Sequence, residues 1–234
     1  MITVHHPLRS LLCSIAVAAA VAAAVTVATT AAAHAASAAK RCAVPRGAKV
    51  SKKTATVVVY SSRKRDRKAG PGRAWVACSK LAGKRISLGF VADEPCTALD
   101  AVEGLRLAGS YLAYATETSD CTGDYGDALV NLIDLKTARH VATDGATSDS
   151  LPNSVSIVAL SLRADGALAW IVQVDSEHLQ PWLVYGSDAS GVRALDSSDK
   201  PLGALTLTDG SVSWANNGQP RSAALGAGPA VNGN

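Results

Sequence analysis

Residues 160–170 read LSLRADGALAW, and this stretch decides the fold class of the chain. Apolar and polar residues alternate on both sides of Asp165-Gly166, so that every second side chain lies on one face, as in a half-buried β-strand. The Asp-Gly dipeptide accepts the positive φ angles of a tight turn. The stretch therefore predicts a β-hairpin whose second strand ends in the aromatic Trp170.

The same pattern recurs elsewhere in the chain. LRLAGSYLAY occupies residues 105–114, LTLTDGSVSW occupies residues 205–214, and a more degenerate copy covers Val50 to Tyr60. The second strand of each copy ends in an aromatic residue. These residues are Tyr60, Tyr114, Trp170 and Trp214, and successive ones are 54, 56 and 44 positions apart. Their equivalent places predict core packing between modules, with a binding face as the alternative.

A second hairpin is expected after each of the first three copies. Its strands are residues 75–78 with 83–88, 129–134 with 138–141, and 182–185 with 191–195, whereas the last module has only Arg221 to Leu225 left. About four strands in roughly 45 to 55 residues is the size of a propeller blade. We therefore predict an all-β, propeller-like meander of about four four-stranded modules, with a β-sandwich as the alternative.

Closure of such a ring is a separate question. A ring of blades protects its sheet edges when the first and last strands share a blade. Here residues 42–49 would have to complete the short last module. If they do not, the arc stays open or dimerises.

Two pieces of the third module resemble blades of the Tol-system β-propeller, a family of secreted repeat proteins. RADGALAW at residues 163–170 resembles the blade hairpin PDG-x-x-IA-[FY], with Ala164 in place of the proline. YGSDASGVRAL at residues 185–195 resembles the piece v-x-d-x-d-G-x-x-x-x-L. The resemblance covers one module well and two others loosely, and it implies an architecture without an activity.

Residues 1–38 have the layout of a secretory signal peptide. A polar start ending in Arg9 precedes an apolar run from Leu11 to Ala28, and two A-x-A sequences follow. We expect cleavage after Ala35 or Ala38, with a retained membrane anchor as the alternative. This predicts an extracellular or cell-envelope protein that has no transmembrane helix after signal cleavage.

The predicted domain organisation has three parts. Residues 1–38 are the signal peptide, residues 39–225 form a single propeller-like β domain, and residues 226–234 form a flexible tail. Residues 61–72 and 144–154 are polar and contain Gly or Pro, so we expect them to be surface connections.

Four cysteines remain once Cys13 leaves with the signal peptide: Cys42, Cys78, Cys96 and Cys121. An even number in an oxidising compartment predicts two disulfides, and four cysteines allow three connectivities. The cysteines stand alone, without C-x-x-C pairs, so we expect no metal site and no cofactor.

Charge is distributed unevenly along the chain. Fifteen Lys or Arg face four Asp or Glu from Lys40 to Asp100, against seven and fifteen from Ala101 to the end of the chain. This asymmetry either steers an anionic partner or draws the two halves of the fold together. The densest run is a candidate anion-binding site: Arg63, Lys64, Arg65, Arg67 and Lys68.

This basic run has two interpretations. It could dock an anionic polymer, such as an envelope glycopolymer or nucleic acid, because each neutralised phosphate releases counterions. Alternatively, it is a solvated hairpin tip. No aromatic side chains interleave with the charges, which disfavours base stacking.

Catalytic patterns are weak in this sequence. The expected mature chain offers His140 and His178 as imidazole bases, without a nucleophile motif around any serine. Carboxylate pairs for glycan hydrolysis would be Asp175 with Glu177, or Asp196 with Asp199. The acidic residues 120–127 do not have EF-hand spacing and predict a disulfide-pinned surface loop rather than a calcium site.

These observations lead to one functional hypothesis with two alternatives. We expect an exported, non-catalytic binding or interaction domain of unknown ligand, whose partner is an anionic envelope polymer or another protein. The alternatives are a secreted hydrolase acting on glycans or esters and a purely structural envelope protein.

Overall fold

The computed structural model describes residues 42–93, 99–119, 126–145, 154–175 and 181–229. These residues form fifteen β-strands in four antiparallel meanders, here called modules 1 to 4. Module 1 consists of β1 (Lys49–Lys53), β2 (Val57–Asp66), β3 (Gly70–Ser79) and β4 (Lys84–Ala92). Module 2 consists of β5 (Leu99–Ala108), β6 (Tyr111–Ser119), β7 (Gly126–Asp134) and β8 (Arg139–Gly145). Module 3 consists of β9 (Ser154–Leu162), β10 (Leu168–Asp175), β11 (Trp182–Asp188) and β12 (Gly191–Ser198). Module 4 consists of β13 (Leu202–Thr208), β14 (Ser211–Asn216) and β15 (Gln219–Ala224).

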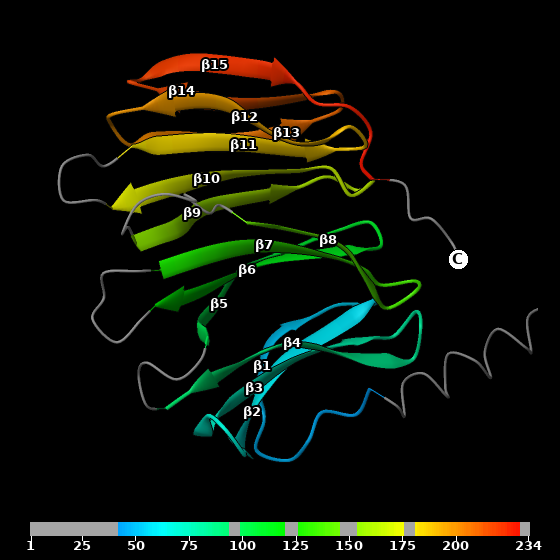
Figure 1. Cartoon of the computed structure of the whole chain (residues 1–234). Helices are drawn as coiled ribbons and strands as arrows, with labels where there is room; N and C mark the ends of the chain where they lie inside the picture. Colours follow the sequence, from blue (N-terminus) through cyan, green and yellow to red (C-terminus); the bar gives the residue numbers. More distant parts are fainter. Residues whose placement is uncertain (1–41, 94–98, 120–125, 146–153, 176–180, 230–234) are drawn as a thin grey trace, which may run out of the picture.

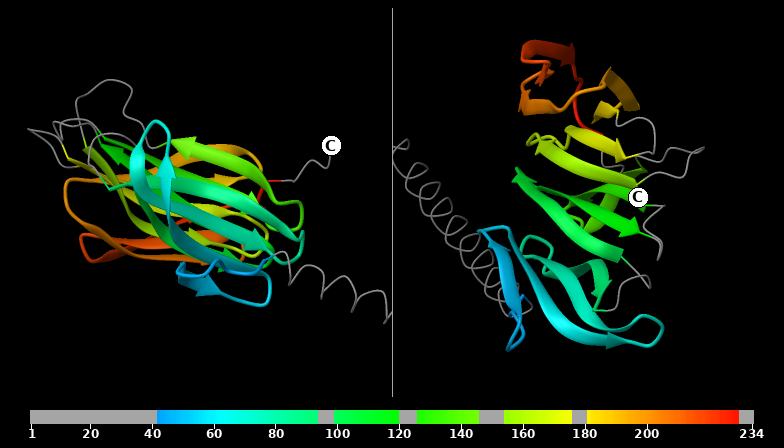
Figure 2. Two further views of the ribbon diagram at one scale, coloured as in Figure 1. Left: turned by 90° about the horizontal axis from the view of Figure 1, so that it is seen from below. Right: turned by 90° about the vertical axis from the view of Figure 1, so that its left-hand side faces the viewer.

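The modules follow one another in chain order as a stack of sheets. Figure 1 shows module 1 at one end and module 4 at the other, and Figure 2 shows the same succession from a second side. A single parallel pair, Val91 with Leu99, joins the sheets of modules 1 and 2. The predicted all-β, propeller-like meander is therefore confirmed, including the short last module.

The predicted hairpins are present in all four modules. The turn glycines Gly166 and Gly210 have φ angles of 95° and 82°, which is the left-handed region that Asp-Gly turns require. Alternation along the strands places opposite faces of each sheet against different neighbours. In β10, for example, Trp170 packs toward module 2 while Ile171 packs toward module 4.

Three apolar clusters fill the spaces between successive modules. Tyr114 lies between modules 1 and 2, Trp170 between modules 2 and 3, and Trp214 between modules 3 and 4. All three side chains are buried, and burial raises the pKa of Tyr114 to about 12, so its hydroxyl stays neutral. The predicted packing of these aromatic residues between modules is confirmed.

Tyr60 departs from the expected role. Each of the other aromatic residues faces the module before its own, and no module precedes module 1 among the described residues. Tyr60 is buried instead beneath residues 42–48, together with Val58 and the disulfide of Cys42 and Cys78. The prediction that it packs between modules is thus wrong, because an N-terminal segment takes the place of the missing neighbour.

The first strand of each module is interrupted by a β-bulge or an equivalent irregularity. The register shifts lie between Val50 and Lys52 in β1 and between Glu103 and Arg106 in β5. In module 3 the shift in β9 lies opposite Ile171 and Val172 of β10, and in module 4 it lies between Gly203 and Thr206 in β13. Every one lies opposite or close to the aromatic residue of the second strand. Bulges twist an edge strand and interrupt its row of backbone groups, which protects the edge from pairing with another strand.

The arc of modules is open. β15 pairs with β14 alone, and residues 42–48 pack on module 1 rather than completing module 4. The disulfide explains this placement, because it ties Cys42 to β3 of module 1.

Two predicted connections differ in the structure. Residues 61–72 are not a loop, since β2 continues to Asp66 and β3 begins at Gly70. Charged side chains at successive positions are compatible with a strand whose two faces are both solvated, since successive side chains point to opposite faces. Residues 144, 145 and 154 belong to β8 and β9, and residues 146–153 lie outside the described residues.

Candidate anion-binding site

The five predicted cations lie on one projection of module 1. β2 and β3 pair from Val57 with Ser79 to Asp66 with Gly70, so the basic run occupies the end of a long hairpin, and β4 pairs with β3 as far as Gly72. We call residues 61–74 the basic hairpin. Its five cationic side chains, Arg63, Lys64, Arg65, Arg67 and Lys68, are all exposed.

The carboxylate of Asp66 organises the tip of the basic hairpin. It accepts hydrogen bonds from the backbone N–H groups of Lys68 at 2.8 Å and Ala69 at 3.1 Å. These two bonds hold the pKa of Asp66 below its ordinary value. The only acidic residue inside the hairpin is therefore directed at backbone donors in the turn, and the neighbouring cations stay available to solvent.

The register between β2 and β3 brings a further cation, which the sequence analysis did not predict, next to the basic run. Arg73 of β3 is the direct cross-strand partner of Arg63 and therefore lies on the same face of the hairpin. Ten positions separate the two residues, and their contact depends on the length of the turn. The turn residues Pro71 and Gly72 precede Arg73 and could have indicated a hairpin. Because residues 61–72 were expected to form a loop, the pairing of Arg73 with Arg63 was not predicted.

The surroundings of the hairpin are strongly basic. Residues 42–93 contain thirteen Lys or Arg and two Asp or Glu. The second acidic residue, Asp93, approaches Arg63 at 3.4 Å, and the Arg63 side chain is 75% exposed. An exposed ion pair of this kind contributes little free energy, so it competes weakly with an external anion.

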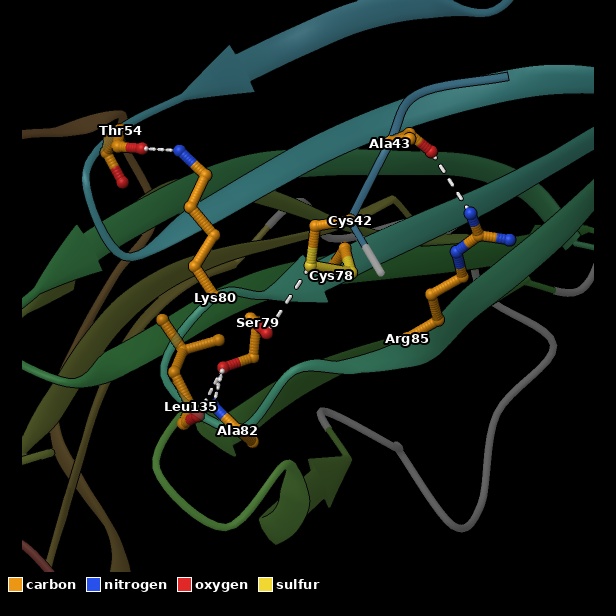
Figure 3. Close-up of a disulfide and its surroundings, with 9 residues drawn as sticks. All are labelled: Cys42, Ala43, Thr54, Cys78, Ser79, Lys80, Ala82, Arg85 and Leu135. Carbon is orange, nitrogen blue, oxygen red and sulfur yellow. Dashed lines mark hydrogen bonds between the residues drawn. A yellow bond between two sulfur atoms is a disulfide. The ribbon is translucent and has the colours of Figure 1, made fainter. Parts of the chain in front are cut away.

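Two of the four cysteines expected to form disulfides are joined in module 1. Cys42 and Cys78 are joined with their Cα atoms 5.5 Å apart, and Arg85 Nη2 donates to the Ala43 carbonyl at 3.0 Å (Figure 3). The hydroxyl of Ser79 donates to the Leu135 carbonyl of module 2. Cys96 and Cys121 lie outside the described residues.

The candidate carboxylates for hydrolysis are dispersed or already engaged. Asp196 accepts hydrogen bonds from Trp214 Nε1 at 2.7 Å and Asn216 Nδ2 at 2.9 Å, which joins module 3 to module 4. Burial disfavours its ionised form, but these bonds outweigh burial and hold the pKa of Asp196 below its ordinary value. Asp199 is exposed in the connection that follows β12.

Other residues named for chemistry lie apart from one another. Asp175 ends β10 and His140 is exposed on β8, whereas Glu177, His178 and residues 120–125 lie outside the described residues. Within the described ranges, no group of three His, Cys, Asp or Glu side chains is arranged to hold a metal ion. No helix in those ranges has the length and apolar character needed to cross a membrane.

Two arginine-carboxylate pairs hold the C-terminal segment, and sequence analysis did not anticipate them. Arg163 binds Asp165 with contacts of 2.9 and 2.8 Å and donates to the Gly226 carbonyl, while Gly228 N donates to Asp165 at 3.0 Å. Asp188 accepts from Gly226 N at 2.8 Å and Arg193 Nη1 at 2.9 Å. We call this set the C-terminal clasp, and it engages residues 226–228 of the expected flexible tail.

No protein-family model matches the chain, and no curated protein sequence matches it. The architecture of four antiparallel modules is loosely compatible with propeller blades. Function has to be argued from the surface of the molecule itself.

Proposed function

We propose that this protein is an exported, non-catalytic domain that binds an anionic polymer through the basic hairpin. The observation that carries the proposal is the cluster of five exposed cations at the end of the β2–β3 hairpin. A cluster of one sign attracts polyanions and releases their counterions on binding. The ionised Asp66 cancels one of these charges, so residues 63–68 keep a net charge of +4.

Export is part of the proposal. The signal-peptide layout of residues 1–38 supports it, and so does the disulfide between Cys42 and Cys78, because disulfides persist in oxidising compartments. A rigid meander is a suitable scaffold for such a domain, since the hairpin continues the strands of a buried sheet. Val57, Val59 and Ala77 of β2 and β3 anchor it in the core.

Polymer binding can be measured directly with the full mature chain. Fluorescently labelled long-chain polyphosphate is titrated with the protein at about 50 mM and about 200 mM salt. With about −0.7 in the slope of log K against log salt for each neutralised phosphate, five contacts predict affinity about a hundredfold weaker at the higher salt. Binding must remain measurable at about 0.15 M ionic strength, where exposed charges are screened beyond about 8 Å.

A five-site variant and a matched control test whether the hairpin is responsible. Replacing the five hairpin cations with Gln should weaken binding at least tenfold. The control removes five exposed cations from other parts of the molecule and should bind within about threefold of the wild type, because long-range charge alone adds little at this ionic strength. The control positions are Arg46, Lys53, Lys84, Lys136 and Lys200. Equal loss in both variants would show that net charge, rather than the hairpin, attracts the polymer.

A further inference from the structure

The basic hairpin has two unlike faces. Cross-strand partners lie on one face of a sheet, so Arg63 shares its face with Arg73, and Arg65 lies two positions further along on the same face. Lys64 lies on the opposite face, across from Gly72. We call the set Arg63, Arg65 and Arg73 the arginine face.

The three guanidinium groups are close enough to act on one charged group. Cβ atoms of directly opposite residues are about 4.5 to 5.5 Å apart, and those of diagonal neighbours are about 7 to 8 Å apart or slightly closer. Arg63 and Arg73 are a direct pair, and Arg65 is diagonal to Arg73. Long, flexible side chains converge easily over such distances.

This arrangement is unfavourable for the isolated hairpin. Like charges directly opposite one another in a sheet are destabilising. Among the described residues, Asp93 is the only carboxylate that contacts the arginine face, and it contacts Arg63 alone at 3.4 Å. Arg65 and Arg73 have no carboxylate partner in that part of the chain. An external anion would relieve the repulsion and use their guanidinium donors.

The chemistry of the arginine side chains indicates which kind of anion they would bind. Guanidinium presents a planar fork of N–H donors that matches two oxygens of a phosphate, a sulfate or a carboxylate, whereas ammonium acts as a point charge. Along the strand, Arg63 and Arg65 are separated by two residues, which corresponds to about 6.6 to 6.8 Å. A linear polymer with tetrahedral oxyanions repeated along its chain fits this row.

Nucleic acid bound by base stacking fits less well. Residues 61–74 contain no aromatic side chain. Trp75, the nearest aromatic residue on the same face, packs against the cluster between modules 1 and 2. The hairpin therefore lacks the stacking platforms that single-strand binding proteins use.

We propose that the arginine face recognises phosphate or sulfate groups of a linear polymer through bidentate guanidinium contacts. This inference rests on the proposed polymer-binding function and adds to it the chemical class of the ligand. It also assigns a binding residue, Arg73, that lies outside the contiguous basic run. Lys64, Arg67 and Lys68 then supply general attraction.

A charge-conserving variant separates guanidinium recognition from simple attraction. In the variant R63K/R65K/R73K the net charge is unchanged. Affinity is measured at about 0.15 M ionic strength for long-chain polyphosphate, dextran sulfate and poly-glutamate. We expect at least tenfold weaker binding to polyphosphate, to dextran sulfate or to both, and a smaller loss for poly-glutamate, because guanidinium also pairs with carboxylates. The polymer that shows the largest loss identifies the oxyanion.

The control carries the reverse exchange at three exposed lysines outside the hairpin, K53R/K84R/K200R, and should bind all three polymers as the wild type does. Circular dichroism and thermal unfolding verify that each variant is folded, and the single variant R65K provides a milder change at an exposed position.

Two results would overturn the inference. If R63K/R65K/R73K binds every polymer as tightly as the wild type while the five-site Gln variant does not, charge suffices, and only the broader polymer-binding proposal survives. If wild-type protein binds poly-glutamate as tightly as polyphosphate and dextran sulfate, recognition of tetrahedral oxyanions is also refuted. Absence of binding to all three polymers would instead refute the proposed function itself.

Discussion

The two ends of the stack solve the same problem in different ways. A stack of sheets leaves one face of its first module and one face of its last module without a neighbour, and repeat proteins need caps at such positions. Module 1 keeps an apolar outer face that contains Tyr60 and Val58, and it covers this face with residues 42–48. Module 4 instead exposes a polar outer face, so it needs no cover.

The polar face of module 4 follows from its register. Leu207, Val212 and Ala223 are aligned across the three strands and pack toward module 3. Thr206 and Ser213 form the next aligned pair, on the opposite face, and Ser222 continues that row. Thr206 and Ser222 are exposed on this face, and polar side chains open to solvent cost little free energy.

The means of attachment also differ between the two ends. A disulfide holds the N-terminal cap, whereas hydrogen bonds and ion pairs of the C-terminal clasp hold residues 226–228. The first attachment responds to redox conditions and the second to pH. The edge strands carry related protection: β1 contains three lysines, and β15 contains Pro220 and Arg221.

The largest expected effect on stability is at Trp170, between the two ends of the stack. This side chain is fully buried between modules 2 and 3 and stacks on Tyr185 with ring centroids 5.6 Å apart. Trp170→Ala should lower the free energy of unfolding by about 3 to 5 kcal/mol because it leaves a large cavity. Chemical denaturation measures this loss, with Trp170→Phe as the milder control. An unchanged midpoint would refute its role in packing.

The next largest effect concerns the N-terminal cap. Replacing Cys42 and Cys78 with Ser should lower the free energy of unfolding by about 2 to 4 kcal/mol, because the link closes a loop across a separation of 36 residues. The loss is measured by denaturation of the oxidised proteins. Reductant should destabilise the wild type at least as much as the double substitution does. If the double variant is as stable as the wild type, the segment needs no covalent attachment.

The smallest effect concerns the C-terminal clasp. The hydrogen bond from Arg163 holds the pKa of Asp165 well below its ordinary value. Burial opposes ionisation of Asp188, but hydrogen bonds from Ser190, Gly226 and Arg193 outweigh burial and lower its pKa too. A lowered folded-state pKa stabilises the fold above the unfolded value of about 3.9, and this contribution is lost as the pH falls through the folded-state pKa.

Denaturation between about pH 7 and pH 3 tests the clasp, because its contribution should begin to fall below about pH 5. Asp188→Asn should cost about 1 to 3 kcal/mol at neutral pH, where the wild-type carboxylate is ionised, and flatten the dependence on acid. The matched control is Asp199→Asn, at an exposed position in the next connection. Equal pH profiles for Asp188→Asn and wild type would contradict the role of the clasp.

Much of the fold could be predicted from local patterns. The hairpins around Asp165-Gly166 and Asp209-Gly210, the second hairpins and the short fourth module all appear where alternation and turn residues place them. Both signals act within about ten residues, which is why sequence alone reveals them. The run of cations was likewise visible, but its placement on paired strands was not.

The sequence by itself determined the all-β class, the number of modules and the aromatic residue that each module places in its second strand. Tertiary structure alone decided that Tyr60 lies under a disulfide-held cap, that Arg73 joins Arg63, and that the arc ends in a polar sheet held by a clasp. The reason is how far apart in the sequence the interacting residues lie. A turn or an alternating strand is encoded by adjacent residues. Which surfaces meet depends on register and on packing between segments far apart in the chain.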